Sequence, residues 1–294
     1  MPSLKEVRNR IVSVNSTQQI TKAMKMVSAA KLRRATDAIV QMRPYSQKLT
    51  EMIATVSANA EGAQSNPYTI TRDIQKVLVI VVTSDRGLCG AFNANVGKAT
   101  VNLIAEKYAS QNAAGNVEVL ALGKKGAEYL TRRGYKVNDK FVHIFSKLSF
   151  TSVRQAAEYA MDGFVAEKFD VVEVIFNEFK NVATQILRAE QMLPLVDKQD
   201  SNVKASTVDY IFEPSEEEII SELIPKALKL QVYKAVLESN ASEHGARMTA
   251  MDKATENAGE LLKDLKLVYN RSRQAAITKE ILEIVGGAEA LASA

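Results

Sequence analysis

The sequence predicts an α/β protein in which one α/β domain is inserted between two long terminal helices. Both ends of the 294-residue chain carry heptad patterns of apolar residues that are much longer than a small domain is wide. Between them, the pattern changes to apolar strands that alternate with amphipathic helices. With 46% hydrophobic residues, the chain is long enough to bury a sizeable core.

The N-terminal helix is predicted from Ser3 to about Ser57. Ser3 and Glu6 have the spacing of a capping box, and the first glycine of the chain is Gly62. At about 1.5 Å per residue, this helix is about 80 Å long and has to project from its domain. Pro44 should bend the helix or break it briefly. The heptad positions of its second half are Ala35, Ala38, Met42, Tyr45, Leu49, Met52 and Val56.

The middle of the chain alternates strands and helices after a polar linker at residues 63–67. The predicted strands are residues 76–82, 117–122, 137–145, 171–179, 184–193 and 210–212. The predicted helices between them are residues 94–110, 124–133 and 152–168. Valine-rich and isoleucine-rich runs without alternation indicate strands buried on both faces. This order predicts a parallel, Rossmann-like sheet, with strand 184–193 paired to strand 171–179.

The C-terminal helix is predicted from about Ser221 to Ala292 and is led by Pro214 and a run of glutamates that favours a helix start. It would span about 100 Å. Its seam is broken by the polar residues Asn240, His244 and Arg247, and the apolar or small seam positions that follow are Met251, Ala254, Ala258, Leu261, Leu265, Val268, Ser272 and Ala275. We expect the two long helices to pair as an intramolecular antiparallel coiled coil in which the C-terminal helix outreaches its partner. The predicted segments are therefore residues 1–62, 68–213 and 214–294.

The composition limits the classes of function. No apolar run of about 18 residues occurs, and the N-terminus lacks the apolar core of a signal peptide. Cys89 is the single cysteine, so an internal disulfide and a cysteine-built zinc site are excluded. With two histidines in the chain, a histidine-rich metal site is not expected. We expect no metal and no cofactor.

One short motif, Thr83 to Asn93, lies where a strand is followed by a helix, which is where α/β proteins bind phosphates. Its glycines, Gly87 and Gly90, match neither the dinucleotide fingerprint nor the P-loop. A tight turn is the favoured interpretation. Cys89 could be a nucleophile at a helix N-terminus, but no histidine with an asparagine or aspartate at a recognisable spacing serves it, so a buried structural cysteine is favoured.

Residues 1–34 hold eight lysines and arginines against one glutamate, a net charge of +7. Such a basic rod could bind nucleic acid or an anionic membrane. The basic residues are interleaved with polar ones such as Asn15, Thr17 and Gln18 and lack aromatic partners. A protein interface or a solvated face is therefore favoured, and we expect no nucleic-acid partner.

Two long motifs and the turn resemble the gamma subunits of F-type ATP synthases. The first motif runs from Gln18 to Lys31, and the second comprises residues 241–252, 269–281 and 283–288. The turn Ser84-Asp85-Arg86-Gly87-Leu88-Cys89-Gly90 is similar as well. The resemblance covers the whole chain in order. It implies a central rotor shaft that couples proton or sodium-ion flow to ATP synthesis and performs no chemistry itself.

The resemblance also implies partners. The coiled coil would turn inside a hexamer of alpha and beta subunits, and the apolar tip around residues 284–291 would turn in an apolar collar. The residues that match contacts with the beta subunits are Met24, Lys25, Arg247, Arg273, Gln274, Thr278 and Glu280. For Arg247, the alternative is an ion pair within the coiled coil.

At the other end, Tyr210 and Glu213 match the foot that rests on the epsilon subunit and the membrane c-ring. Residues 197–207 are short and lack cysteine, so the thiol-regulated insertion of chloroplast relatives is not expected. Because no transit peptide is recognised, a bacterial source is favoured over a processed organellar chain. The expected place is the cytoplasmic face of the bacterial inner (plasma) membrane, where the chain would be peripheral and bound only through the complex.

Two functions of other classes remain as alternatives. A stand-alone Rossmann-like enzyme with coiled-coil arms would bind a nucleotide at residues 87–90 by itself. A coiled-coil nucleic-acid binder would show salt-dependent affinity for DNA that survives deletion of the C-terminal helix.

Overall fold

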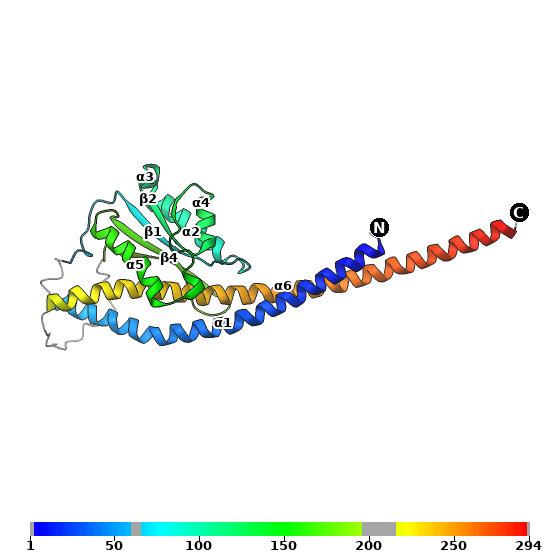
Figure 1. The fold of residues 1–294 in the computed structure, drawn as a ribbon, viewed down its shortest axis with the longest axis horizontal. Helices are drawn as coiled ribbons and strands as arrows, with labels where there is room; N and C mark the ends of the chain where they lie inside the picture. The colour runs from blue at the N-terminus through cyan, green and yellow to red at the C-terminus, as the bar shows by residue number, and fades with distance from the viewer. Residues whose placement is uncertain (1–2, 60–65, 196–215, 293–294) are drawn as a thin grey trace. The chain divides into compact units, whose positions relative to one another are not determined.

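The computed structural model describes residues 3–59, 66–195 and 216–292. The chain divides into two compact units, one formed by residues 28–247 and the other by residues 1–27 together with residues 248–294. The longest elements are α1 (Leu4–Asn59) and α6 (Glu216–Ala292), which is 77 residues long (Figure 1). The two long terminal helices predicted from the sequence are confirmed.

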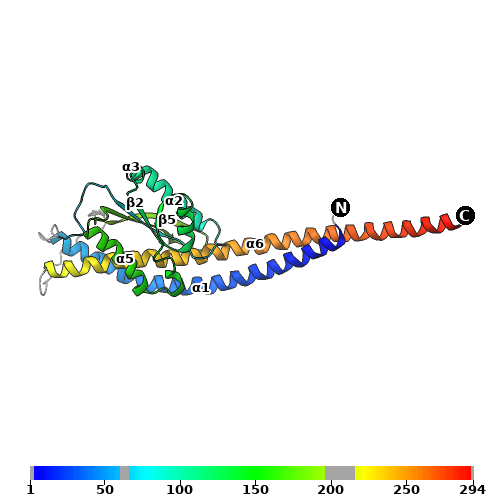
Figure 2. The same ribbon diagram turned by 45° about the horizontal axis from the view of Figure 1, so that its top comes forward.

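The unit of residues 28–247 contains a five-stranded sheet (Figure 2). Its strands are β1 (Val77–Val82), β2 (Val117–Leu122), β3 (Lys136–Asn138), β4 (Val171–Phe179) and β5 (Gln185–Leu193). The strand order is β3-β2-β1-β4-β5, with parallel pairing except between β4 and β5. The parallel sheet and the antiparallel pairing of its last two strands are thus confirmed.

The shorter helices of this unit connect the strands. They are α2 (Phe92–Lys107), α3 (Ala109–Ala113), α4 (Lys124–Thr131), the 3-10 helix η2 (Ile144–Lys147) and α5 (Phe150–Val165). Strand β3 ends at Asn138, whereas the sequence predicted a strand as far as Phe145. The Asn138 side chain accepts a hydrogen bond from the Lys140 amide at 3.2 Å, which turns the chain away from the sheet.

The central strands β1, β2 and β4 are buried on both faces, as their continuous apolar runs predicted, whereas the edge strands β3 and β5 are partly exposed. In β1, Val77, Val79 and Val81 pack with α2 and α4, whereas the alternate residues Leu78 and Ile80 pack with α5 and α6. The α6 residues of this second core are Ile224, Leu228, Val232, Ala235 and Val236. The first half of α6 is therefore a covering layer of the sheet.

The seam of α1 follows a strict heptad, but it differs in part from the predicted one. Its buried residues are Val7, Thr21, Ser28, Leu32, Ala35, Ile39 and Leu49. Tyr45, which was predicted in the seam, is 60% exposed, because Ile39 rather than Ala38 sets the buried face. Helix α1 continues through Pro44, so of the two predicted effects, a bend or a brief break, the break does not occur. Pro44 and Val40, whose carbonyl loses its amide partner, both lie on the exposed face.

In the second unit, residues 4–27 of α1 pair with α6 in the antiparallel sense. Gln18 and Thr21 bond to Thr255, whereas Lys25, further along α1, pairs with the earlier α6 residue Asp252. The buried α6 residues here are Met251, Ala258, Leu262 and Leu265. The seam thus passes through Leu262 rather than the predicted Leu261, and among the described residues burial on α6 ends at Leu265.

Among the described residues, no helix is both long and apolar enough to cross a membrane.

Candidate functional site

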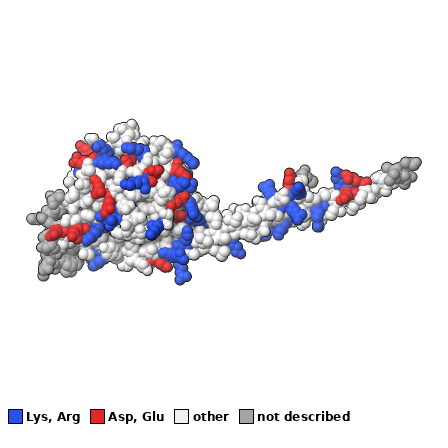
Figure 3. All heavy atoms as spheres, in the orientation of Figure 1, with Lys and Arg blue, Asp and Glu red and all other residues white. Residues whose placement is uncertain are grey.

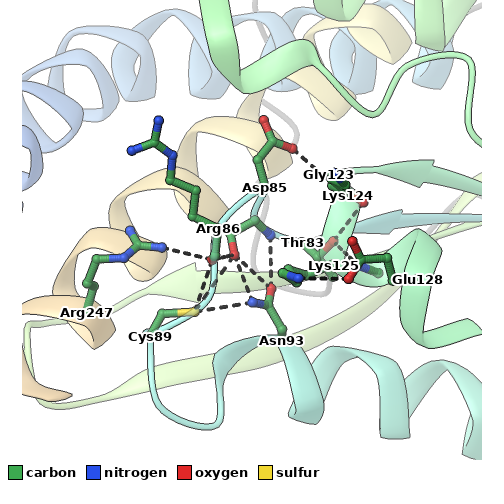
Figure 4. Close-up of polar contacts among 12 residues, drawn as sticks. Thr83, Asp85, Arg86, Cys89, Asn93, Gly123, Lys124, Lys125, Glu128 and Arg247 are labelled. Atoms are coloured by element: carbon green, nitrogen blue, oxygen red, sulfur yellow. Dashed lines mark hydrogen bonds and ion pairs between the residues drawn. The ribbon is translucent and has the colours of Figure 1, made fainter.

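The turn after β1 is held by a small polar network (Figure 4). The Asn93 side-chain amide donates to Ser84 Oγ at 2.8 Å and contacts Cys89 Sγ at 3.2 Å, and Asn93 Oδ1 accepts from the Ser84 amide at 3.0 Å. Cys89 is 2% exposed, and burial raises the pKa of its thiol despite the opposing effect of its hydrogen bond with Ser84. A buried thiol with a raised pKa is a poor nucleophile, which agrees with the structural interpretation of Cys89.

The amide groups at the start of α4 are bound by the protein itself. The Lys124 amide donates to Asp85 Oδ1 at 3.1 Å, and the Gly126 amide donates to Thr83 Oγ1 at 2.8 Å (Figure 4). A phosphate site would offer such amides to a ligand. Here the two amides bind the side chains of Thr83 and Asp85 instead, so they connect the end of β1 to the chain that follows β2.

The crevice where an open α/β sheet usually binds ligands is filled by α6. In the order β3-β2-β1-β4-β5, the strands after β1 are added first on one side of it and then, from β4, on the other. Ligands of such folds bind at this switch point, outside the carboxyl ends of the parallel strands β1 and β4. At this place Ser239 Oγ donates to the Val82 carbonyl at 3.5 Å, and Ser242 Oγ donates to the Asn177 carbonyl at 3.1 Å. Helix α6 therefore occupies the position of a ligand.

Glu238 extends this contact to α1. Its side chain is 2% exposed, accepts from the Phe179 amide at 3.0 Å and pairs with Arg43 at 3.3 Å. One buried carboxylate thus joins the end of β4, α6 and α1 within the unit of residues 28–247.

Arg247, whose contact with a beta subunit stays a prediction, does not lie on an open surface of this chain. The residue is 8% exposed, and its guanidinium forms an ion pair with Glu243 at 2.7 Å. It also donates to the carbonyl of Arg86 at 3.1 Å (Figure 4). A further hydrogen bond reaches the Gly87 carbonyl at 3.2 Å. The polar break in the heptad exists because this stretch of α6 faces the α/β domain.

The two titratable neighbours of Arg247 on α6 have shifted pKa values. Burial raises the pKa of Glu243, although the Arg247 charge opposes the shift. Burial, followed by the charges of Arg247 and Lys31, lowers the pKa of His244 to about 4. His244 Nδ1 lies 3.4 Å from Arg247 Nη1, a contact in which the neutral ring accepts the hydrogen bond.

His244 should therefore make stability depend on pH. Between about pH 6.5 and pH 4 the unfolded state binds more protons than the folded state, so stability is lost as the pH falls through this window. After allowance for the water-exposed part of the ring, we expect a loss of about 1–2 kcal/mol. Urea unfolding at pH 7.5 and pH 4.5 should show this loss in the wild type and a smaller one in His244→Gln. Equal losses in both proteins would contradict the assignment.

The predicted shaft residues lie in the other unit, apart from Arg247. Lys25 pairs with Asp252, and Met24 is half-buried beside it on α1. The other four, Arg273, Gln274, Thr278 and Glu280, are exposed on α6. Thr278 Oγ1 donates to the Gln274 carbonyl at 2.9 Å. At 1.5 Å per residue, Arg273 lies about 30 Å along α6 from Asp252, so the structure places the predicted residues in two separate groups.

Tyr210 and Glu213, with the strand predicted at residues 210–212, lie outside the described residues. Among the described residues, no group of three histidine, cysteine, aspartate or glutamate side chains could hold a metal ion.

Sequence reasoning missed the contact of α6 with the ends of β1 and β4 and with the turn after β1. Its residues are Glu238, Ser239, Ser242, Glu243 and Arg247, all buried. A signal was present, because polar residues recur three to five positions apart on one helix face. That pattern identifies a face with a polar partner but does not say whether the partner belongs to the same chain.

The whole chain has known relatives. Residues 3–291 match the family model described as ATP synthase. Curated proteins named ATP synthase gamma chain are 63% identical in Cytophaga hutchinsonii over 293 residues and 56% identical in Flavobacterium psychrophilum over 291 residues, in each case with 99% of both chains covered. The chain belongs to the ATP synthase gamma chain family.

Solved structures agree with this membership. A chain in the Tetrahymena thermophila mitochondrial ATP synthase central stalk and c-ring is 27% identical, with a TM-score of 0.57 over 80% of this chain and 99% of that one. A chain in the Euglena gracilis mitochondrial ATP synthase has a TM-score of 0.66 over 98% of this chain and 94% of that one; at 22% identity, it shows the likeness in fold. The resemblance read from the motifs is confirmed for this member of the gamma chain family.

Proposed function

We infer that this chain is the central-stalk rotor subunit of an F-type ATP synthase and couples ion-driven ring rotation to conformational cycling of catalytic alpha and beta subunits. The observation that carries this function is the antiparallel pair of α1 and α6, from which the exposed end of α6 continues. Such a rod is stiff because each helix satisfies its own backbone hydrogen bonds and the pair packs along a narrow seam.

The rotor contributes shape and charge rather than chemistry. An asymmetric shaft that turns inside a ring of catalytic subunits presents a different surface to each of them in turn, which biases each toward a different conformation. A non-catalytic subunit also fits the filled crevice of the α/β domain, where α6 takes the place of a ligand. This occupied crevice speaks against the stand-alone nucleotide-binding enzyme.

The charge distribution on the α/β unit does not support a nucleic-acid interface there, whereas the basic residues of segment 1–34, on which the nucleic-acid alternative rests, belong to α1. Figure 3 shows acidic and basic side chains interspersed on the visible face of the α/β unit. A nucleic-acid interface would gather lysine and arginine on one face of a domain.

The proposed stator contacts are the exposed α6 residues Arg273, Gln274, Thr278 and Glu280, with Met24 and Lys25 as a second group on α1. Exposed polar side chains suit a shaft that has to form and break contacts with a stator repeatedly, because such contacts cost little free energy to break in water. Arg247 would meet a beta subunit only after leaving its contacts with Glu243, Arg86 and Gly87.

At the other end, Tyr210 and Glu213 are proposed to contact the epsilon subunit and the membrane c-ring. The chain would then be peripheral on the cytoplasmic face of the bacterial inner membrane, held there by the complex.

Reconstitution with alpha and beta subunits tests the function and the contact group together. We expect the wild-type chain to assemble with them, and Arg273→Glu to lower the ATP hydrolysis rate of the assembled complex about threefold or more, because the reversed charge meets its partner surface unfavourably. The matched control is Lys279→Glu, whose side chain points about 240° around the helix from Arg273. Failure of the wild type to assemble would overturn the function, whereas equal rates for both variants would overturn the contact group.

A further inference from the structure

The strongest unassigned feature lies on the buried side of α6, where Arg247 holds the turn after β1. Its Nη2 donates to the carbonyls of Arg86 at 3.1 Å and Gly87 at 3.2 Å, and its Nε also reaches the Gly87 carbonyl at 3.3 Å. Two adjacent carbonyls thus share one guanidinium. A planar fork of donors can serve both at once, whereas an ammonium group has no such geometry.

The ion pair with Glu243 orients this guanidinium. Glu243 stands one helical turn before Arg247, is 7% exposed and contacts Nη1 at 2.7 Å. With Nη1 directed to the carboxylate, Nε and Nη2 remain for the turn. The buried positive charge is therefore compensated by a carboxylate and two carbonyl dipoles.

The turn itself needs support. Leu88 has a φ of 61° although it carries a branched side chain, and it is 63% exposed. Gly90 follows with a φ of 60°, and no atom lies within 4 Å of the place where Gly87 would carry a Cβ. A leucine in the left-handed region is strained, and such strain persists where surrounding contacts determine the backbone.

We propose that Arg247 is a positioning residue that latches the Ser84–Gly90 turn to α6 and so fastens the α/β domain to the shaft helix. The Ser84, Cys89 and Asn93 network holds the inner side of the turn. Arg247 holds its outer carbonyls from α6. One consequence rests on the proposed rotor function. When α6 rotates, the hydrogen bonds of Arg247 make the Ser84–Gly90 turn rotate with it.

Cys89 provides a direct reporter of the latch, because it is the single cysteine of the chain and is 2% exposed inside the turn. The test measures the rate at which a maleimide labels Cys89 in the isolated full-length chain. In Arg247→Gln we expect labelling to be about tenfold faster or more than in the wild type, because the lost charge-assisted hydrogen bonds raise the population of the open turn.

The direction of the effect is diagnostic. Burial raises the pKa of Cys89, while the Arg247 charge lowers it, so removal of that charge alone would reduce the reactive thiolate and slow the labelling. An increase therefore reports exposure and not thiol activation. Arg247→Lys, which keeps the charge but loses the fork, should give an intermediate rate.

The matched control is Arg43→Gln, which removes another arginine that bonds α6, at Glu238, without a contact to the turn. We expect this control to label at the wild-type rate.

The latch is overturned if Arg247→Gln is folded, as checked by circular dichroism, and labels at the wild-type rate. If Arg247→Gln does not fold, the amide hydrogen exchange of Leu88 and Cys89 in Arg247→Lys decides: faster exchange supports the latch, and unchanged exchange overturns it. None of these outcomes depends on assembly with other subunits, so failure of the rotor function would be seen separately.

Discussion

Replacing Gly123 with alanine is expected to lower the free energy of unfolding by about 3 kcal/mol or more. Gly123 has a φ of 127°, outside the regions that residues with a side chain normally adopt. A Cβ atom at this position would lie 2.6 Å from the Thr83 carbonyl carbon. That neighbour is main chain at the end of a buried strand, so it cannot move aside as a flexible side chain would.

Two other glycines separate the two causes of this loss. Gly134 has a φ of 81°, but no atom lies within 4 Å of the place that an added Cβ would take, so Gly134→Ala should cost only the backbone strain of about 1 kcal/mol. Gly87 has open space and no left-handed φ, so Gly87→Ala should change stability little. Urea unfolding of the three variants measures the series, and a Gly123→Ala protein no less stable than Gly134→Ala would refute the steric argument.

The element types of this fold follow from local patterns, which is why they were predictable. The buried strand Val77–Val82 is a continuous apolar run because helices cover both faces of the sheet. Ends of elements depend on single contacts, as at Asn138, where one side-chain hydrogen bond stops a strand that apolar residues would have continued. The phase of a heptad, meaning which residues form its buried seam, also depends on single contacts. Leu261 and Leu262 have the same side chain, and packing against the partner helix buries Leu262.

The sequence indicated that Arg247 belongs to a family motif, but it did not indicate which groups surround the Arg247 side chain. The motif around Arg247 pointed to the family, and the family match together with the polar break in the seam predicted a contact with a beta subunit rather than with the turn after β1. The partners of Arg247 are main-chain carbonyls of Arg86 and Gly87, about 160 positions away in the sequence. The residue types in the turn therefore do not indicate that this contact forms. Backbone acceptors are present at every residue, so their use can be recognised only from the fold.

The second large effect is expected for Phe164→Ala, which should lower the free energy of unfolding by about 3–5 kcal/mol. Phe164 is fully buried on α5, and Arg72 lies over its ring at 5.2 Å from the centroid. Removing the ring leaves a cavity that a sheet covered on both faces closes poorly. The matched control on the same helix is Phe150→Ala, because Phe150 is 41% exposed and its main contact is an edge-to-face pair with Tyr233. We expect that control to cost about 1 kcal/mol.

The same substitution tests whether the base of the shaft helix unfolds with the sheet. Leu228 and Val236 of α6 belong to the core cluster that contains Phe164, so the sheet and this part of α6 bury their apolar surfaces against one another. If they form one cooperative unit, Phe164→Ala should speed amide hydrogen exchange in residues 228–236 of α6 as strongly as in α5. Faster exchange confined to α5 would show that α6 is held independently of the sheet. A helix that shares its core with the domain cannot turn without it, because each would expose the apolar face of the other.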